Sequence, residues 1–164
     1  MTKTGATLVQ NNSWSGSTIG YTGWNGVDTS HTSSFVYRFE KLLSEGFFKE
    51  NKVDTLFVFG GTNDSGSNAP LGELIFDVED KQELFCVLPA ISYFAKRLSE
   101  ELPDTKIVFI GNCEIKFAIT DAFKAVCERY GLAYVQLASI EKINGHPTEL
   151  GMDQISEQII KALG

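Results

Sequence analysis

The sequence has 164 residues, 43% of them hydrophobic, which is enough for a single domain with its own core. Its 21 acidic and 14 basic side chains give a net charge of −7, which argues against binding to nucleic acid or to an anionic membrane surface. No apolar run is long enough to cross a bilayer and the N-terminus lacks a secretory signal, so the chain as written is expected to be cytoplasmic.

Four short apolar runs, at residues 7–10, 55–59, 106–110 and 132–137, predict buried parallel strands. Apolar residues at helical spacing predict helices over 35–43, 84–98 and 118–130. A last helix, over 148–163, would turn four residues inward, namely Leu150, Ile155, Ile159 and Leu163. Alternating strands and helices predict one three-layer α/β/α domain over residues 1–164, with a mainly parallel sheet and its site at the carboxyl ends of the strands.

The strand at 55–59 runs into Gly60-Gly61-Thr62-Asn63-Asp64. This glycine turn brings the amide of Asn63 to the carboxyl edge of the sheet, where it can donate a hydrogen bond to an oxyanion. The same residues also favour an ordinary Asx-type turn without a catalytic role. Taken alone, the motif is compatible with both interpretations.

A second candidate site is Asn144-Gly145-His146-Pro147-Thr148, directly before the last helix. Histidine is the natural general base near neutral pH, so His146 is a candidate for that role. The alternative is a helix-capping loop in which the histidine is incidental.

A third candidate is the polar turn of residues 11–18, which follows the strand at 7–10. It can offer a backbone N–H, such as that of Gly16, or a serine hydroxyl. A serine-rich loop that is merely well solvated is the alternative.

Taken in their order along the chain, the three motifs resemble the conserved blocks of SGNH hydrolases, the GDSL family. FVFGGTNDSG is similar to the third block and GHPTELGMDQI to the fifth, and the resemblance covers nearly the whole chain. It implies a flavodoxin-like sheet, with Asn63 and the backbone N–H of Gly16 as oxyanion donors and His146 as general base. Neither a metal nor a cofactor is expected, because the three cysteines lack metal-ligand spacing and no glycine-rich nucleotide motif follows a strand.

The nucleophile departs from the family's pattern, which places a serine in a first block about thirty residues before the glycine of the second. Only fifteen residues precede Gly16. In one explanation NNSWSGS is the second block, and the chain is N-terminally incomplete, without the first strand and the nucleophile. In the other, Ser13 is the nucleophile. We favour the first explanation, because the second requires that a strand and a helix are missing from the middle of the domain.

The acid that orients the histidine is also displaced. Ile143 occupies the position where the family usually has an aspartate, and Glu141 is the nearest carboxylate. Glu141 could hold the imidazole if the loop is longer than usual. Some enzymes of this kind work with a serine–histidine dyad.

The resemblance implies an ester hydrolase, and we expect acetyl or other short acyl esters of carbohydrates as substrates. Tyr21 and Trp24 could stack on a sugar ring, and Thr62 adjoins the oxyanion donor. A non-catalytic chain that keeps the pocket without the nucleophile is the alternative function. Loss of the central first strand would leave a sheet edge unpaired, so we expect an altered strand order or a homodimer that pairs through that edge.

Overall fold

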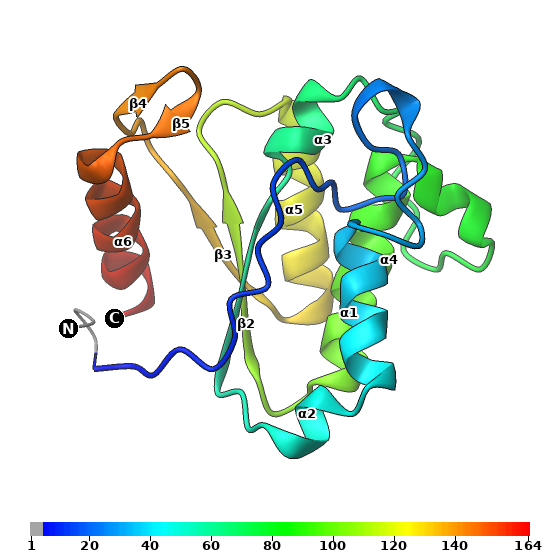
Figure 1. The fold of residues 1–164 in the computed structure, drawn as a ribbon, viewed down its shortest axis with the longest axis horizontal. Coiled ribbons are helices and arrows are strands. Elements are labelled where there is room, and N and C mark those ends of the chain that lie inside the picture. Colours follow the sequence, from blue (N-terminus) through cyan, green and yellow to red (C-terminus); the bar gives the residue numbers. More distant parts are fainter. Residues whose placement is uncertain (1–4) are drawn as a thin grey trace.

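The computed structural model describes residues 5–164 and has a parallel sheet at its centre (Figure 1). Strands β1 (Thr55–Gly60), β2 (Lys106–Gly111) and β3 (Ala133–Gln136) lie side by side in that order. The helices are α1 (Phe35–Ser44), α2 (Phe47–Glu50), α3 (Thr62–Gly66), α4 (Val87–Glu101), α5 (Phe117–Tyr130) and α6 (Glu149–Leu163). Two short 3-10 helices, η1 (Trp24–Gly26) and η2 (Lys81–Phe85), and a hairpin of β4 (Lys142–Ile143) and β5 (His146–Pro147) complete the fold. The predicted α/β class with a parallel sheet is confirmed.

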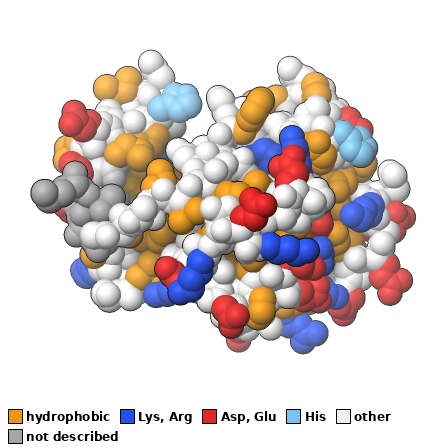
Figure 2. All heavy atoms as spheres, turned by 60° about the horizontal axis from the view of Figure 1, so that its bottom comes forward, with side chains coloured by type: hydrophobic (Ala, Val, Ile, Leu, Met, Phe, Trp, Pro, Cys, Tyr) orange, Lys and Arg blue, Asp and Glu red, His pale blue; other side chains and the backbone are white. Residues whose placement is uncertain are grey.

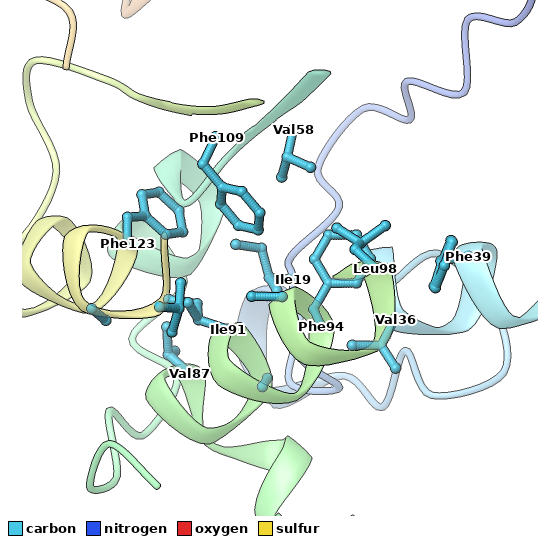
Figure 3. Packing of buried hydrophobic residues seen from close by; sticks show 14 of the residues in the cluster. Ile19, Val36, Phe39, Val58, Val87, Ile91, Phe94, Leu98, Phe109 and Phe123 are labelled. Carbon is cyan, nitrogen blue, oxygen red and sulfur yellow. The ribbon is translucent and has the colours of Figure 1, made fainter. Parts of the chain in front are cut away.

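Different helices cover the two faces of the sheet. On the face covered by α1, α4 and α5, Phe109 of β2 is fully buried, and its ring centroid lies 6.3 Å from that of Phe94 and 5.5 Å from that of Phe123 (Figure 3). Val108 and Ile155 are buried in the cluster on the opposite face, beneath α6. Because side chains alternate along β2, this one strand contributes to both clusters.

Strand β1 forms an open edge of the sheet. Phe57 and Phe59 are 52% and 41% exposed, although Val108 and Ile110, which pair with them in β2, are buried. The cluster beneath α6 takes core side chains from β2 and β3 but not from β1. Among the described residues no strand pairs with the outer side of β1, so both the edge and two of its aromatic side chains face solvent.

The prediction of a strand at residues 7–10 is wrong. The chain there is exposed and unpaired, with Leu8 74% and Val9 47% exposed. A strand needs a neighbour for its backbone groups, and the described sheet has no strand in the place that the resemblance gives to the first one, between this segment and β1. The expected pairing of two copies through the edge of β1 stays a prediction.

Two helix predictions also need correction. The helix expected over 84–98 is divided at Cys86, whose extended backbone (φ −100°, ψ 144°) separates η2 from α4. In α6, Leu150 is 52% exposed rather than turned inward. The buried residue of that turn is Gly151, which packs against the backbone of Glu141.

The face of the molecule in Figure 2 carries acidic and basic side chains side by side, rather than one extended basic surface. None of the described helices is long and apolar enough to cross a membrane.

Candidate functional site

Two glycines at the end of β1 let the chain turn sharply into α3. Gly61 has a left-handed φ of +87°, and a Cβ there would lie 3.1 Å from side-chain atoms of Ile119 and Phe123. A Cβ at Gly60 would come within 2.8 Å of the ring of Phe35. Only glycine fits this close approach without strain, and the turn places Asn63 at the carboxyl edge of the sheet.

The side chain of Asn63 has two partners. Its Nδ2 donates to the backbone oxygen of Ser17 at 2.9 Å, and its Oδ1 accepts from Nε1 of Trp24 at 3.3 Å. The next residue, Asp64, is buried, and its Oδ1 accepts from the N–H of Ile19 at 2.9 Å. Asn63 and Asp64 therefore dock the segment of residues 17–19 onto the exit of β1. One N–H of the Asn63 amide remains for another acceptor.

Among the acidic groups of this site, Asp64 has the most strongly shifted pKa. Its second carboxyl oxygen, Oδ2, is buried without a hydrogen-bond partner. Burial raises the pKa of Asp64 to about 6, although backbone N–H groups, including that of Ile19, act in the opposite direction. The contacts with the backbone give Asp64 a structural role.

Gly16 lies beside this motif, in a turn closed by a hydrogen bond from the N–H of Ser17 to the oxygen of Trp14 at 3.3 Å. Its φ of +75° is the left-handed conformation that favours glycine. Its N–H donates no hydrogen bond to a described residue. A Cβ at Gly16 would lie 4.0 Å from Cδ1 of Trp24. The N–H that the resemblance assigns to an oxyanion is thus available.

Of the two predicted aromatic platforms, the structure brings one to the site. Trp24 is 47% exposed, and its ring leaves no space for a Cβ at Gly66 in α3, which would lie 2.8 Å from the indole. Tyr21 is 8% exposed and packs edge-on against Phe85, with 5.5 Å between ring centroids. Tyr21 lines a separate cavity of about 450 Å³ together with His31. Gly16, Trp24 and Asn63 therefore come together, whereas Tyr21 is buried away from them.

His146 lies on the short β4–β5 hairpin. Asn144 and Gly145 form its two-residue turn, with φ of 52° and 79°, and Ile143 pairs with His146 across it. These positive φ values are typical of the type I′ turn, for which Asn-Gly is the preferred sequence. His146 is exposed, and its ring makes no hydrogen bond or ion pair with a described residue.

Neither candidate partner of His146 forms a hydrogen bond with its imidazole. Oε1 of Glu141 accepts from Oγ1 of Thr148 at 2.5 Å, and Thr148 also caps α6 by accepting from the N–H of Gly151 at 3.1 Å. Ser13 is exposed, and its N–H donates to Oδ1 of Asn11 at 3.0 Å. The structure joins neither Glu141 nor Ser13 to His146, so both roles stay predictions.

Sequence reasoning missed three polar residues that hold the loops of the site. Arg38, in α1, donates to the backbone oxygen of Asn12 and, at 3.3 Å, to Oγ of Ser17. Asn112, after β2, donates to Oγ1 of Thr62 at 3.0 Å and accepts from Nζ of Lys142 at 3.3 Å. The described residues contain no cluster of three or more His, Cys, Asp or Glu side chains that could hold a metal ion.

The sequence profile of a family described as GDSL-like lipase/acylhydrolase matches residues 1–163. No curated protein matches the chain significantly.

Three solved structures are similar to the chain. Two are described as GDSL-like lipases, from Bacteroides ovatus and Bacteroides uniformis. Each is 34% identical to the chain with a TM-score of 0.81, over 90% of this chain and 67% and 65% of theirs. The chain thus spans about two thirds of their length. A Lactobacillus plantarum protein, 20% identical over 91% of this chain and 77% of its own, shares the fold with a TM-score of 0.65.

Proposed function

The chain belongs to the GDSL-like lipase/acylhydrolase family, and from this premise we propose that it hydrolyses acyl esters, in particular acetyl esters of carbohydrates. The observation that carries the proposal is the meeting of Gly16, Trp24 and Asn63 at the exit of β1. The hairpin with His146 lies at the same edge of the sheet (Figure 1). Oxyanion donors and a general base are two of the groups that acyl transfer needs, and the third is a nucleophile.

The free N–H of Gly16 and the remaining N–H of Asn63 would hold the oxyanion that forms when the ester carbonyl is attacked. The hydrogen bond from Trp24 to Oδ1 of Asn63 fixes which end of the amide is the donor. Donors that are oriented before the reaction need no reorganisation in the transition state, and each is worth about 3–4 kcal/mol of barrier.

His146 would take the proton of a serine hydroxyl as the serine attacks the ester, and would return it to the departing sugar hydroxyl. Water then releases the acyl group from the serine by the same route. Ser13 is the candidate nucleophile within the chain, and a serine outside residues 1–164 is the other source. Because no hydrogen bond joins the imidazole to Glu141, the described geometry supports a dyad rather than a triad that includes Glu141.

Trp24 supports a carbohydrate as the alcohol part of the ester. Its half-exposed indole lies next to the donor Asn63, so a sugar ring stacked on it would place an acyl group beside the oxyanion donors. We expect Trp24→Ala to raise KM for an acetylated oligosaccharide more than for p-nitrophenyl acetate, which has no sugar ring.

The test is release of p-nitrophenol from p-nitrophenyl acetate. His146→Ala should lower kcat/KM by about 100-fold or more. The matched control is His31→Ala, because the chain has two histidines and both are exposed. Activity that survives in His146→Ala, or that falls equally in His31→Ala, would refute the role of His146.

A binding module without turnover is the second candidate function, and it is favoured by one observation. No serine among the described residues forms a hydrogen bond with the ring of His146. In this case acetylated oligosaccharides should bind at equilibrium, with loss of affinity in Trp24→Ala, and remain intact after prolonged incubation. Release of acetate would eliminate this alternative.

A further inference from the structure

Lys142, in β4, is a nearly buried cation beside the candidate site. Its side chain is 10% exposed, and its Nζ lies 2.8 Å from Oε2 of Glu114. Nζ also donates to Oδ1 of Asn112 at 3.3 Å and contacts Sγ of Cys113 at 3.7 Å. Lysine is seldom buried unless it is paired, and all three partners belong to the segment that leaves β2.

Asn112 extends this connection toward β1. The residue is 7% exposed, and its Nδ2 donates to Oγ1 of Thr62 at 3.0 Å. Thr62 directly precedes Asn63, so a chain of side-chain hydrogen bonds leads from the histidine hairpin to the loop of the oxyanion donor. Hydrogen bonds to charged groups contribute about twice as much to stability as hydrogen bonds between neutral groups.

On the side of the β4–β5 hairpin that faces β1 and β2, the described residues offer few other contacts. Its strands have two residues each, and an isolated two-stranded hairpin is marginally stable. The flanking Glu141 is tied to α6 through Gln154, which accepts from its N–H at 2.7 Å, and to Thr148 at the start of α6. These contacts fix the hairpin relative to α6, whereas Lys142 fixes it relative to β1 and β2.

We propose that Lys142 is a positioning residue that sets the distance between His146 and Asn63 by tying the β4–β5 hairpin to the exit of β2. The inference rests on the proposed function, in which a general base and an oxyanion donor act on the same ester. A misplacement of about 1 Å between such groups can cost 100-fold in rate. Lys142 touches no reacting atom and acts through the backbone of its hairpin.

The experiment compares Lys142→Met, which keeps an unbranched side chain one atom shorter and removes its charge, with Lys142→Arg. Lys52→Met is the matched control, because Lys52 pairs with Asp54 at 2.9 Å on the exposed surface. In Lys142→Met, kcat for p-nitrophenyl acetate should fall at least tenfold with KM changed less than threefold, and amides of residues 142–146 should exchange hydrogen faster. Arginine should restore most of kcat, and Lys52→Met should match the wild type.

Glu114→Gln provides a milder variant, since Glu114 is 70% exposed and its loss does not threaten folding. This variant should also lower kcat and speed amide exchange in the hairpin, both by less than Lys142→Met. Unchanged amide exchange in Lys142→Met would overturn the proposal, and so would faster exchange with an unchanged kcat. A wild-type chain without esterase activity would instead refute the proposed function, and the exchange data would still decide whether Lys142 fixes the hairpin.

Discussion

The side-chain amide of Asn63 donates to the backbone oxygen of Ser17 at 2.9 Å, across 46 positions of sequence. This contact attaches the turn of Gly16 to the end of β1, and so places the two candidate oxyanion donors beside each other. The same amide thus has a structural partner and a hydrogen left for catalysis, and the two roles can be separated by experiment.

Asn63→Ala should lose both roles. The oxygen of Ser17 would lose its donor, which costs about 1–3 kcal/mol of the free energy of unfolding, and kcat should fall by about 100-fold or more. Asn51→Ala is the matched control, because Nδ2 of Asn51 donates to the oxygen of Phe47 at 2.9 Å, in a different part of the fold. Urea unfolding should show similar losses in both variants, with kcat reduced only in Asn63→Ala. Equal kcat values would contradict the role of Asn63 in the reaction.

The buried carboxyl of Asp64 predicts a pH dependence of stability. Its pKa is about 6 in the folded protein and 3.8 when unperturbed. The folded state therefore holds a proton that the unfolded state releases first, so this contribution is complete below pH 3.8 and is lost as the pH rises through 6. The loss amounts to roughly 2–3 kcal/mol.

Asp64→Asn keeps an oxygen for the N–H of Ile19 but cannot ionise. The free energy of unfolding, measured in urea from pH 4 to pH 7, should rise relative to the wild type as the pH increases. The difference between the two proteins isolates Asp64 from groups with the opposite effect, such as Glu40, whose pKa is lowered by Arg97 despite its burial. A difference that does not change with pH would show that folding does not raise the pKa of Asp64.

The parts of the fold that sequence predicts are those whose signal is local. The apolar runs at 55–59 and 106–110 became β1 and β2, which pair along their whole length; both faces of β2 are covered, whereas β1 is covered on one face. The segment at 7–10 has a similar composition but no neighbouring strand, and composition carries no information about the neighbour. The hairpin at His146 did have a local signal, the dipeptide Asn144-Gly145.

The residues of the candidate site also fall into those with a local sequence signal and those without one. Asn63 and Gly61 belong to a short motif whose residues are adjacent in sequence. Lys142, Asn112 and Arg38 act over separations of 21–50 residues and stand in no recognisable pattern. Their roles arise only from which loops the sheet brings together.

Replacement of Gly151 by alanine is expected to change the stability in the direction opposite to that given by helix propensity. Alanine is usually better than glycine in a helix by about 1 kcal/mol. A Cβ at Gly151, however, would lie 2.1 Å from the backbone oxygen of Glu141. Gly151→Ala should therefore lower the free energy of unfolding by about 1–3 kcal/mol, because helix and hairpin must separate. Met152→Ala, at a 57% exposed position of the same turn, should change it by less than about 0.5 kcal/mol.

The open edge of β1 leads to the last prediction, that two copies of the chain pair through it. An edge strand with unpaired backbone groups and exposed apolar side chains is a template for another strand. The chain itself offers a segment for this pairing, because residues 7–10 belong to no strand and expose the apolar side chains of Leu8 and Val9. In a second copy these residues could pair with β1 and cover Phe57 and Phe59.

Sedimentation velocity over a range of protein concentrations tests this pairing. The wild type should show a concentration-dependent dimer, and Phe57→Lys should shift it to monomer at little cost in stability, because Phe57 is already 52% exposed. Phe117→Lys is the control, since Phe117 is 87% exposed at the start of α5 and does not belong to the edge strand. A wild type that stays monomeric at all concentrations would refute the dimer. Dissociation by Phe117→Lys alone would place the interface at α5 instead of β1.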